Sequence, residues 1–294
     1  MVKIKLIGFD SMGTRGMATV IDIDGFKVFI DPGVNIAPRR YGLPPHPLEL
    51  EALEKHLDEI HRETIDSNVL IITHYHRDHY LYREGEAEYY RGKIVLIKDP
   101  NRKINYSQRV RAHILLNKLG IKDIASKVKP ADNETFDFNN IKIRFSKPLP
   151  HGARGSKLGY TLAVSVETPY GVIVHASDVQ GPMDREALEE ILRFEPDILI
   201  ISGPPTYFEG LRINSENINE GLRNMLELAE RVKEGSTLIV DHHLLRDLNY
   251  YSKVKHIVEA CSVRNVRFIT AAEFMGLEIK QLEAMRRTLW EENH

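Results

Sequence analysis

Residues 70–80 read LIITHYHRDHY, and this stretch decides the fold. An apolar run is followed within six positions by His74, His76, Asp78 and His79. His74 and His76 lie two apart in an extended segment and point to one side, while the turn after them can bring Asp78 and His79 to a neighbouring point. A lone histidine is usually a hydrogen-bonded loop or core residue, but four such residues suit two adjacent metals. The stretch therefore predicts a metal centre at the end of a buried strand.

The sequence on either side predicts a mixed α/β fold. Short β-prone runs fill the first thirty residues, with Asp24-Gly25 as a hairpin signal, and β patterns return over 135–176. Helical periodicity marks 48–64 and 105–119, and helices alternate with strands from about 184 to the C-terminus. Two mixed sheets facing each other, with helices outside both, satisfy this order. No fixed-period repeat or linker interrupts it, so we expect a single domain over 1–294.

Composition narrows the class of protein. The chain has 294 residues, 42% of them hydrophobic and 28% charged, which is typical of a globular protein. Its net charge of -2 provides no overall positive field for nucleic acid. Cys261 is the single cysteine, so an internal disulfide or a cysteine-based metal site is excluded. The N-terminus resembles no signal peptide and no apolar run reaches the ~20 residues of a membrane span, so we expect a soluble cytoplasmic protein.

The motif THYHRDH, placed behind VLIIT, resembles the H-x-H-x-D-H signature of the metallo-β-lactamase fold. This resemblance implies a four-layer αββα sandwich of two mixed sheets with outer helices. It also implies further ligands downstream, each at the end of a strand. The sequence supplies them in order: His151 after SKPLP, Asp178 at the end of GVIVHASD, and His242 or His243 at the end of TLIVDHH.

The resemblance also implies how the ligands divide between two metals. One metal would be held by His74, His76 and His151, the other by Asp78, His79 and His242, with Asp178 shared. His242 is preferred to His243 because it stands at the same distance from its strand as the family's single histidine. Asp31, in VFIDPG, matches the aspartate that ends a strand in the fold's first motif. We expect it to accept a ring N–H from a ligand histidine rather than to bind metal.

The implied activity is that of a dinuclear zinc-dependent hydrolase, with manganese or iron as possible alternatives. Two metals lower the pKa of a bridging water, and the resulting hydroxide attacks a small anionic ester, lactone or phosphodiester. Asp78 would orient the hydroxide, and His243, if it is not a ligand, would protonate the leaving group. The segment after His151 resembles ribonuclease Z-like and lactonase-like members. SMGTRGMATVIDID and DPGVNIAPRRYGLPPHP resemble an archaeal branch of the fold, a resemblance that implies no substrate.

Substrate contacts are expected from two loops. Arg39 and Arg40 in IAPRRYG can clamp a phosphate or carboxylate, although a solvated loop explains them equally well. Tyr207 in GPPTYFEG can offer its hydroxyl to a small-molecule substrate, although a structural turn also explains this segment.

Two alternative functions remain open. One is a ribonuclease Z-like nuclease, disfavoured by the near-neutral charge and the absence of a long Gly/Pro-rich arm. The other is a redox or sensing protein with iron in the same ligands.

Overall fold

The first sheet has six strands in the order β1-β2-β3-β4-β5-β6, in a computed structural model that describes residues 1–210 and 213–292. The strands are β1 (Val2–Ile7), β2 (Ala18–Ile23), β3 (Phe26–Ile30), β4 (Val69–Ile72), β5 (Ile94–Ile97) and β6 (Lys127–Pro130). β1, β2 and β3 are antiparallel, and β3 to β6 are parallel. Asp24 and Gly25 have φ of 51° and 91°, as a tight hairpin turn requires, which confirms the predicted hairpin.

The second sheet has the order β15-β14-β13-β12-β11-β8-β7 within the same described ranges. The strands are β7 (Thr135–Phe138), β8 (Ile141–Phe145), β11 (Val164–Thr168), β12 (Gly171–His175), β13 (Ile198–Ser202), β14 (Thr237–Asp241) and β15 (Arg267–Ile269). β12 to β15 are parallel, and the remaining neighbours are antiparallel. A separate antiparallel pair, β9 (Leu149–Pro150) and β10 (Tyr160–Thr161), stands at the end of this sheet.

One predicted strand is divided in the structure. The run GYTLAVSVET reads as continuous β sequence, but it forms β10 and β11 with a break at Leu162 and Ala163. The Leu162 N–H donates to the carbonyl of Thr73 at 3.1 Å, and the Ala163 N–H donates to the Ser146 hydroxyl at 2.9 Å. The chain therefore leaves the sheet to contact the end of β4, which sequence periodicity does not reveal.

Eight α-helices surround the sheets in the described part of the chain. They are α1 (Pro47–Asp66), α2 (Tyr106–His113), α3 (Ile121–Ile124), α4 (Arg185–Leu192), α5 (Ser215–Arg231), α6 (Tyr250–Val263), α7 (Ala271–Phe274) and α8 (Leu282–Glu292). α1 begins with a proline, whose missing N–H has no helical partner at that position. α2 continues into a wider π-helical turn over Ile114–Lys118 before the chain reaches Gly120, where φ is 71°.

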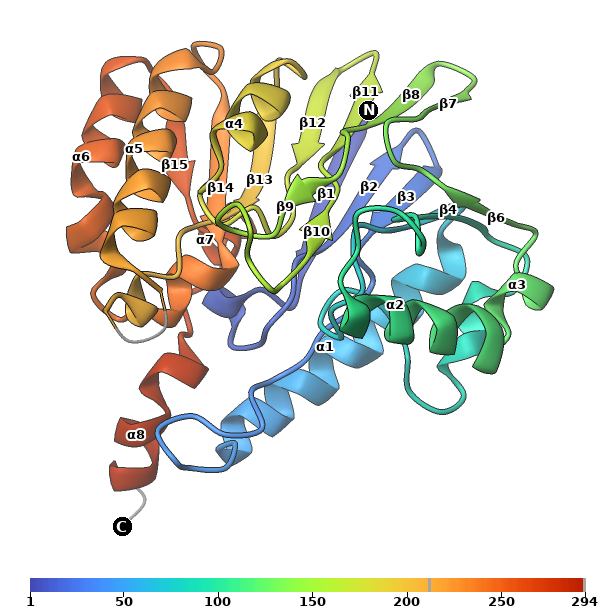
Figure 1. The fold of residues 1–294 in the computed structure, drawn as a ribbon, viewed down its shortest axis with the longest axis horizontal. Helices are drawn as coiled ribbons and strands as arrows, with labels where there is room; N and C mark the ends of the chain where they lie inside the picture. The colour runs from blue at the N-terminus through green and yellow to red at the C-terminus, as the bar shows by residue number, and fades with distance from the viewer. Residues whose placement is uncertain (211–212, 293–294) are drawn as a thin grey trace.

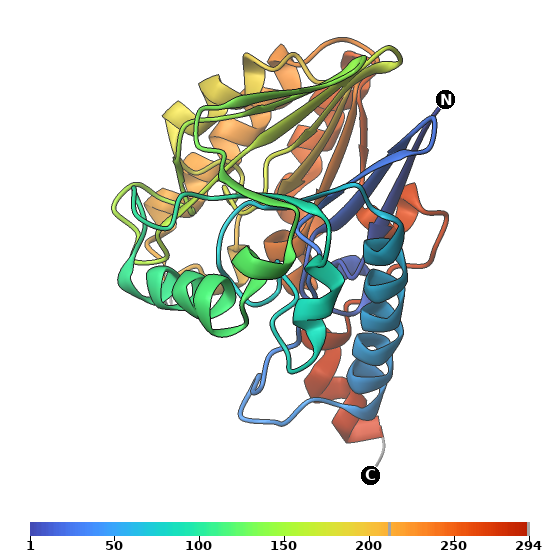
Figure 2. The same cartoon turned by 90° about the vertical axis from the view of Figure 1, so that its right-hand side faces the viewer.

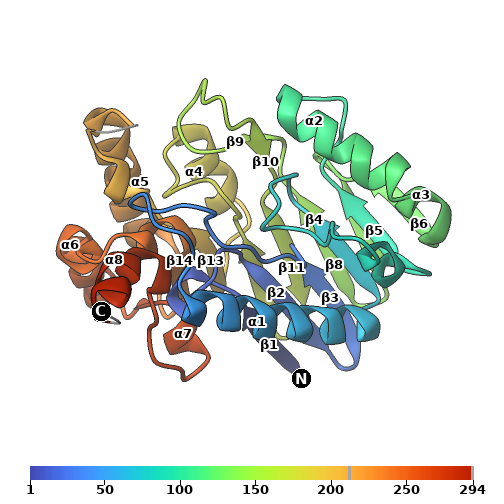
Figure 3. The same cartoon turned by 90° about the horizontal axis from the view of Figure 1, so that it is seen from below.

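Three apolar clusters separate four layers. The first lies between the sheets, where Ile21 and Ile71 from one sheet meet Val166 and Ile173 from the other. The second joins α4, α5 and α6 to the outer face of the second sheet, and the third joins α1 and α2 to the outer face of the first. Figures 1 and 3 show α4 to α6 and α1 on opposite sides of the sheets, and Figure 2 shows β1 to β3, in blue, beside the second sheet. The predicted αββα sandwich is confirmed.

The carboxyl ends of the central strands meet at one end of the sandwich. β3 and β4 lead to Asp31 and Thr73, and β12 and β14 lead to Asp178 and His242. The loops after β3 and β4 touch through their backbones: a Cβ on Gly33 would lie 2.1 Å from the backbone nitrogen of Tyr80. Only glycine permits this approach. Strand ends that are distant in sequence are thereby held around one point.

Candidate metal centre

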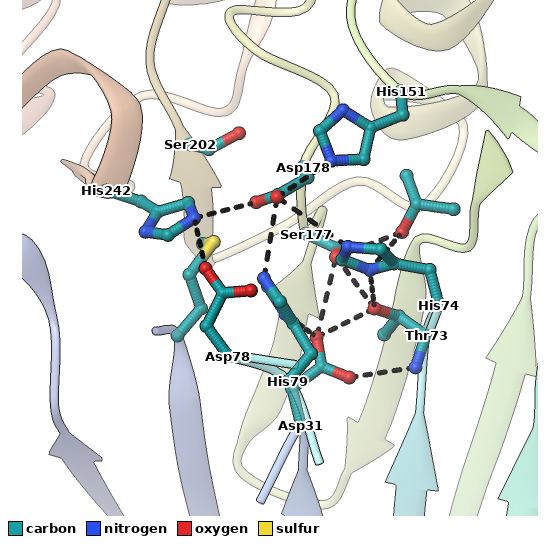
Figure 4. Close-up of polar contacts among 12 residues, drawn as sticks. Asp31, Thr73, His74, Asp78, His79, His151, Ser177, Asp178, Ser202 and His242 are labelled. Carbon is teal, nitrogen blue, oxygen red and sulfur yellow. Dashed lines mark hydrogen bonds and ion pairs between the residues drawn. The ribbon is translucent and has the colours of Figure 1, made fainter. Parts of the chain in front are cut away.

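Three histidines converge on Asp178. His151 Nε2 lies 2.9 Å from Asp178 Oδ2. His79 Nε2 and His74 Nε2 lie 3.4 Å and 3.7 Å from the same oxygen. All four side chains are buried, and Figure 4 shows the three rings directed at the carboxylate, His74 and His79 from the segment after β4 and His151 from the segment after β9.

A second set of contacts reaches Asp178 from the other side. His242 Nε2 lies 3.4 Å from Asp178 Oδ1 and 3.8 Å from Asp78 Oδ2. The His76 ring lies with its centroid 4.6 Å from those of both His74 and His151. The predicted ligands are thus all brought together, although LIITHYHRDHY supplies only four of them.

The ligand atoms fall into groups of metal-binding size. One group consists of His74, His76, His151 and Asp178, and another of Asp78, His79 and His242; within each, the ligand atoms lie within 4.8 Å of one another. Asp178 is close to members of both. These memberships are the ones expected from the sequence resemblance, whereas the role of these side chains as metal ligands stays a prediction.

Unpaired polar atoms provide a test of whether this set suits metal ions. The Nε2 atoms of His74, His79 and His151 and the Oδ1 atom of Asp178 are buried, and among the described residues none of them has a partner with hydrogen-bond geometry, although His151 Nε2 lies 2.9 Å from Asp178 Oδ2. Buried polar groups without a partner are rare because desolvation is then uncompensated. Imidazole nitrogen and carboxylate oxygen are also the donors that zinc, manganese and iron accept. The residues present therefore fit a pair of divalent metals.

The protonation states of His74 and Asp178 suit metal binding. Burial and the neighbouring imidazoles of His79 and His76 lower the pKa of His74 well below its ordinary value. Burial raises the pKa of Asp178, but the surrounding histidines, His242 first, hold it well below the usual value. A neutral imidazole and an ionised carboxylate are the forms that coordinate metal. At His79 and His242 burial lowers the pKa, but nearby carboxylates, Asp178 first, raise it above the ordinary value, so a metal that binds there must displace a proton.

Asp31 supports two of these histidines. Its Oδ2 lies 2.8 Å from His79 Nδ1, so the ring N–H donates to the carboxylate and Nε2 is left free to face Asp178. Asp31 Oδ2 also accepts a hydrogen bond from the Thr73 hydroxyl at 2.7 Å. The Thr73 hydroxyl oxygen in turn lies 3.1 Å from His74 Nδ1. The structure thus places Asp31 behind the rings, in direct contact with His79 Nδ1 and linked to His74 Nδ1 through the Thr73 hydroxyl.

An equivalent support for His242 was not predicted from the sequence. His242 Nδ1 lies 2.7 Å from Asp10 Oδ2, and Asp10 also accepts from Arg246 Nε at 2.9 Å. Burial raises the pKa of Asp10, but Arg246 and His242 lower it to about 2. Asp10 lies in the short segment just after β1, and Asp31 directly follows β3, so the position of Asp10 beyond a strand end was the available signal.

His243 occupies a different position from His242. Its Nε2 lies 3.3 Å from Asp178 Oδ2, and its Nδ1 lies 3.3 Å from Arg246 Nη1. Gln180, which was also not predicted, lies between His243 and His151, with its Nε2 3.3 Å and 3.4 Å from a ring nitrogen of each. Burial and the Arg246 guanidinium lower the pKa of His243 to about 3.

A cavity of about 1040 Å³ opens over this centre. His76, Asp78, Asp178 and His243 face it, and so does Tyr207. The lining described by the structure does not include Arg39 or Arg40. Arg40 is used inside the protein: it donates to the Arg246 carbonyl at 2.9 Å and stacks 4.5 Å from the Tyr207 ring. Arg39 is exposed. The proposed site therefore does not include Arg39 or Arg40.

Comparison with known sequences places the chain among archaeal proteins. It is 44% identical over 293 residues to a UPF0282 protein of Aeropyrum pernix, a match that covers 98% of each chain. The chain belongs to the UPF0282 family. Another UPF0282 protein, from Methanopyrus kandleri, is 42% identical over 98% of this chain and 99% of its own. No protein-family model matches the chain.

Solved structures show which fold this UPF0282 chain has. The metallo-β-lactamase fold protein YhfI from Bacillus subtilis superposes with a TM-score of 0.56 at 13% identity, over 92% of this chain and 97% of that one. CmlA, a diiron beta-hydroxylase from Streptomyces venezuelae, superposes with a TM-score of 0.52 at 11% identity, over 92% of this chain and 52% of CmlA. The chain therefore has the metallo-β-lactamase fold, as the sequence resemblance implied.

None of the helices in residues 1–210 and 213–292 is both long and apolar enough to cross a membrane.

Proposed function

We propose that this protein is a hydrolase that uses two divalent metal ions, zinc first, with manganese or iron as alternatives. Its substrate would be a small anionic ester, lactone or phosphodiester, and the protein would act in the cytoplasm. One observation carries this proposal: buried nitrogens and a carboxylate oxygen without hydrogen-bond partners meet beneath a cavity of about 1040 Å³. Such a set is costly to bury unless a bound ligand pairs with it.

The residues that would hold the metals are His74, His76 and His151 for one, Asp78, His79 and His242 for the other, and Asp178 for both. Bound there, divalent metals would supply a Lewis acid and activate water at neutral pH. Asp31 and Asp10 would fix the orientation of His79 and His242, because each carboxylate accepts a hydrogen bond from the Nδ1–H group and leaves Nε2 directed toward the site.

Asp78 is suited to hold the attacking water and accept its proton. Its carboxylate faces the cavity and is 18% exposed, whereas the Asp178 side chain is 2% exposed. Burial raises the pKa of Asp78, but His79 and His242 hold it well below the usual value, so the carboxylate is ionised. In the reaction, the water oxygen would bond to the attacked carbon or phosphorus, the bond to the leaving oxygen would break, and the leaving oxygen would take up the proton that Asp78 accepted from the water.

His243 is suited to donate a hydrogen bond to the substrate. The Arg246 guanidinium is always a donor, so Nδ1 of His243 accepts and the ring proton resides on Nε2. That Nε2 faces Asp178 beside the cavity. We propose that this Nε2–H donates a hydrogen bond to the attacked or leaving oxygen as negative charge develops there. The Tyr207 hydroxyl is a second candidate donor.

Turnover provides the test. The zinc- and manganese-loaded protein is assayed against bis(p-nitrophenyl) phosphate, a set of lactones and a set of thioesters, with Asp78→Asn measured in parallel. We expect hydrolysis of at least one class and a loss of roughly 10²-fold or more in Asp78→Asn. Arg109→Gln, an exposed change on α2, is the control and keeps full activity. Full activity in Asp78→Asn would contradict the assignment.

Two other outcomes identify the alternatives. Protein purified without added metal that carries iron and hydrolyses nothing would favour a redox or sensing role. RNA binding that weakens steeply with salt, together with RNA cleavage, would favour a nuclease.

A further inference from the structure

The cavity has two walls that differ in how their cations are paired. We define the Arg246 wall as Arg15 and Arg246, and the Arg111 wall as Arg77, Ser107, Arg111 and Lys157; all six residues line the cavity. The lining carboxylates in the described chain are Asp78 and Asp178, which the proposed function assigns to metal. Arg154, which also lines the cavity, pairs with Asp184 at 2.9 Å. Neutralisation of the remaining cations must come from behind the walls or from a ligand.

The Arg246 wall is neutralised from within the protein. Arg246 pairs with Asp10 at 2.9 Å, and Arg15 Nη2 donates to Glu283 at 2.6 Å. Asp10 and Glu283 are both buried. These arginines are already committed to internal carboxylates, so they provide little free charge to a substrate.

The Arg111 wall has no such partners. Within the described ranges, no carboxylate oxygen lies within 4.0 Å of the charged nitrogens of Arg77, Arg111 or Lys157. Arg111 Nη1 donates to the Tyr75 carbonyl at 3.2 Å, and the Arg77 guanidinium lies 5.0 Å from the Tyr82 ring. A carbonyl and an aromatic ring orient these guanidiniums but leave their charge uncompensated.

Hydrogen bonds fix the backbone segments that carry these cations, whereas the Arg77 and Lys157 side chains are exposed. Asn105 Nδ2 donates to the Lys157 carbonyl at 2.7 Å, and Gln108 Nε2 donates to the Leu158 carbonyl at 2.7 Å. Gln108 is fully buried, and its Oε1 accepts from the Tyr75 N–H at 3.2 Å. The loop between β9 and β10 is thereby fixed to α2 and to the strand end that carries His74 and His76, and Figure 3 shows these segments close together.

We infer that the Arg111 wall binds a second anionic group of the substrate, a phosphate remote from the bond that is hydrolysed. Two planar guanidiniums and one ammonium from separate segments suit the several oxygens of a phosphate. The inference rests on the proposed function in one respect: the reacting group must sit at the metal centre. It adds that the substrate carries phosphate at a distance from that centre, and the cavity of about 1040 Å³ has room for such a molecule.

Alkane bisphosphonates of increasing length, each paired with its alkyl monophosphonate, test this inference by titration calorimetry on the metal-loaded protein. Their carbon–phosphorus bonds are not hydrolysed, so binding is measured without turnover. At one or more lengths we expect the bisphosphonate to bind roughly tenfold more tightly than its monophosphonate. In the double variant Arg111→Gln, Lys157→Gln that ratio should fall toward one. Arg77→Gln, with its metal content checked, is a second variant with the same expectation.

Arg109→Gln is the matched control, because it removes one positive charge from the same helix at an exposed position outside the cavity lining. It should leave the ratio unchanged. A ratio near one at every length in the unmodified protein, or a ratio that the double variant retains, would overturn the inference. If the ratio behaves as expected but no substrate class is hydrolysed, the proposed function fails and the phosphate site stands.

Discussion

The Arg246 wall and the Arg111 wall carry similar positive groups in one cavity but differ in what neutralises them. Behind the first, buried Asp10 and Glu283 hold the arginines. The second has oriented cations without carboxylate partners in the described chain. An internally paired arginine stabilises the fold and orients its neighbours, whereas an unpaired one is available to a ligand. The same residue type therefore supports the candidate metal centre on one side and would select the substrate on the other.

The largest effect is expected from breaking the pair behind the Arg246 wall. Asp10→Asn leaves the buried Arg246 guanidinium without its counter-charge and should lower the free energy of unfolding by about 3–5 kcal/mol. The same change weakens the support of His242 Nδ1, so metal affinity should fall roughly 10–100-fold. Denaturant unfolding and competitive metal titration measure the two effects. Stability equal to that of the unmodified protein would mean that this pair does not hold the wall.

A smaller effect is expected from acid, through His56 behind the same wall. His56 Nδ1 lies 2.8 Å from the Thr14 hydroxyl, and burial lowers the pKa of His56 to about 4. Because the folded pKa is below the unfolded value of 6.5, this contribution to stability is complete above pH 6.5 and is lost as the pH falls toward 4.

Unfolding free energies of the unmodified protein and His56→Gln at pH 7 and pH 5 check this expectation. The unmodified protein should lose about 2 kcal/mol more than the variant over this interval. Equal losses in both proteins would show that His56 is protonated without cost in the folded state.

The smallest effect on stability is expected at the Arg111 wall. Arg111→Gln removes no ion pair that the described structure contains, so the free energy of unfolding should change by no more than about 0.5 kcal/mol. Thermal unfolding beside Arg15→Gln, which does lose a carboxylate partner, makes the comparison between the walls direct. An Arg111→Gln variant that is less stable than Arg15→Gln would reverse the assignment of the two walls.

Most of the fold and the position of the candidate metal-binding cluster could be predicted from the sequence. His74, His76, Asp78 and His79 are local to one strand end, and the resemblance to the metallo-β-lactamase fold implied His151, Asp178 and His242 as the residues that join them. The division between β10 and β11 could not, because it follows from a hydrogen bond between Leu162 and Thr73.

Contacts between residues that are far apart in the sequence also could not be predicted. Asp10 and His242 are 232 residues apart, and only the folded structure brings the carboxylate to the ring. Arg40 was expected to face the substrate, but it packs on Tyr207 and the Arg246 carbonyl. Whether an arginine is neutralised depends on tertiary partners, so composition and spacing do not distinguish the two walls.

Metal stoichiometry tests the central claim most directly. Protein purified without added metal, and again after reloading, is analysed by mass spectrometry for bound metal beside the variant Asp178→Ala. The account predicts two equivalents of a divalent metal in the unmodified protein and a loss of at least one in the variant, because Asp178 would contact both ions. Protein that binds no metal after reloading, or a variant that keeps both equivalents, would contradict it.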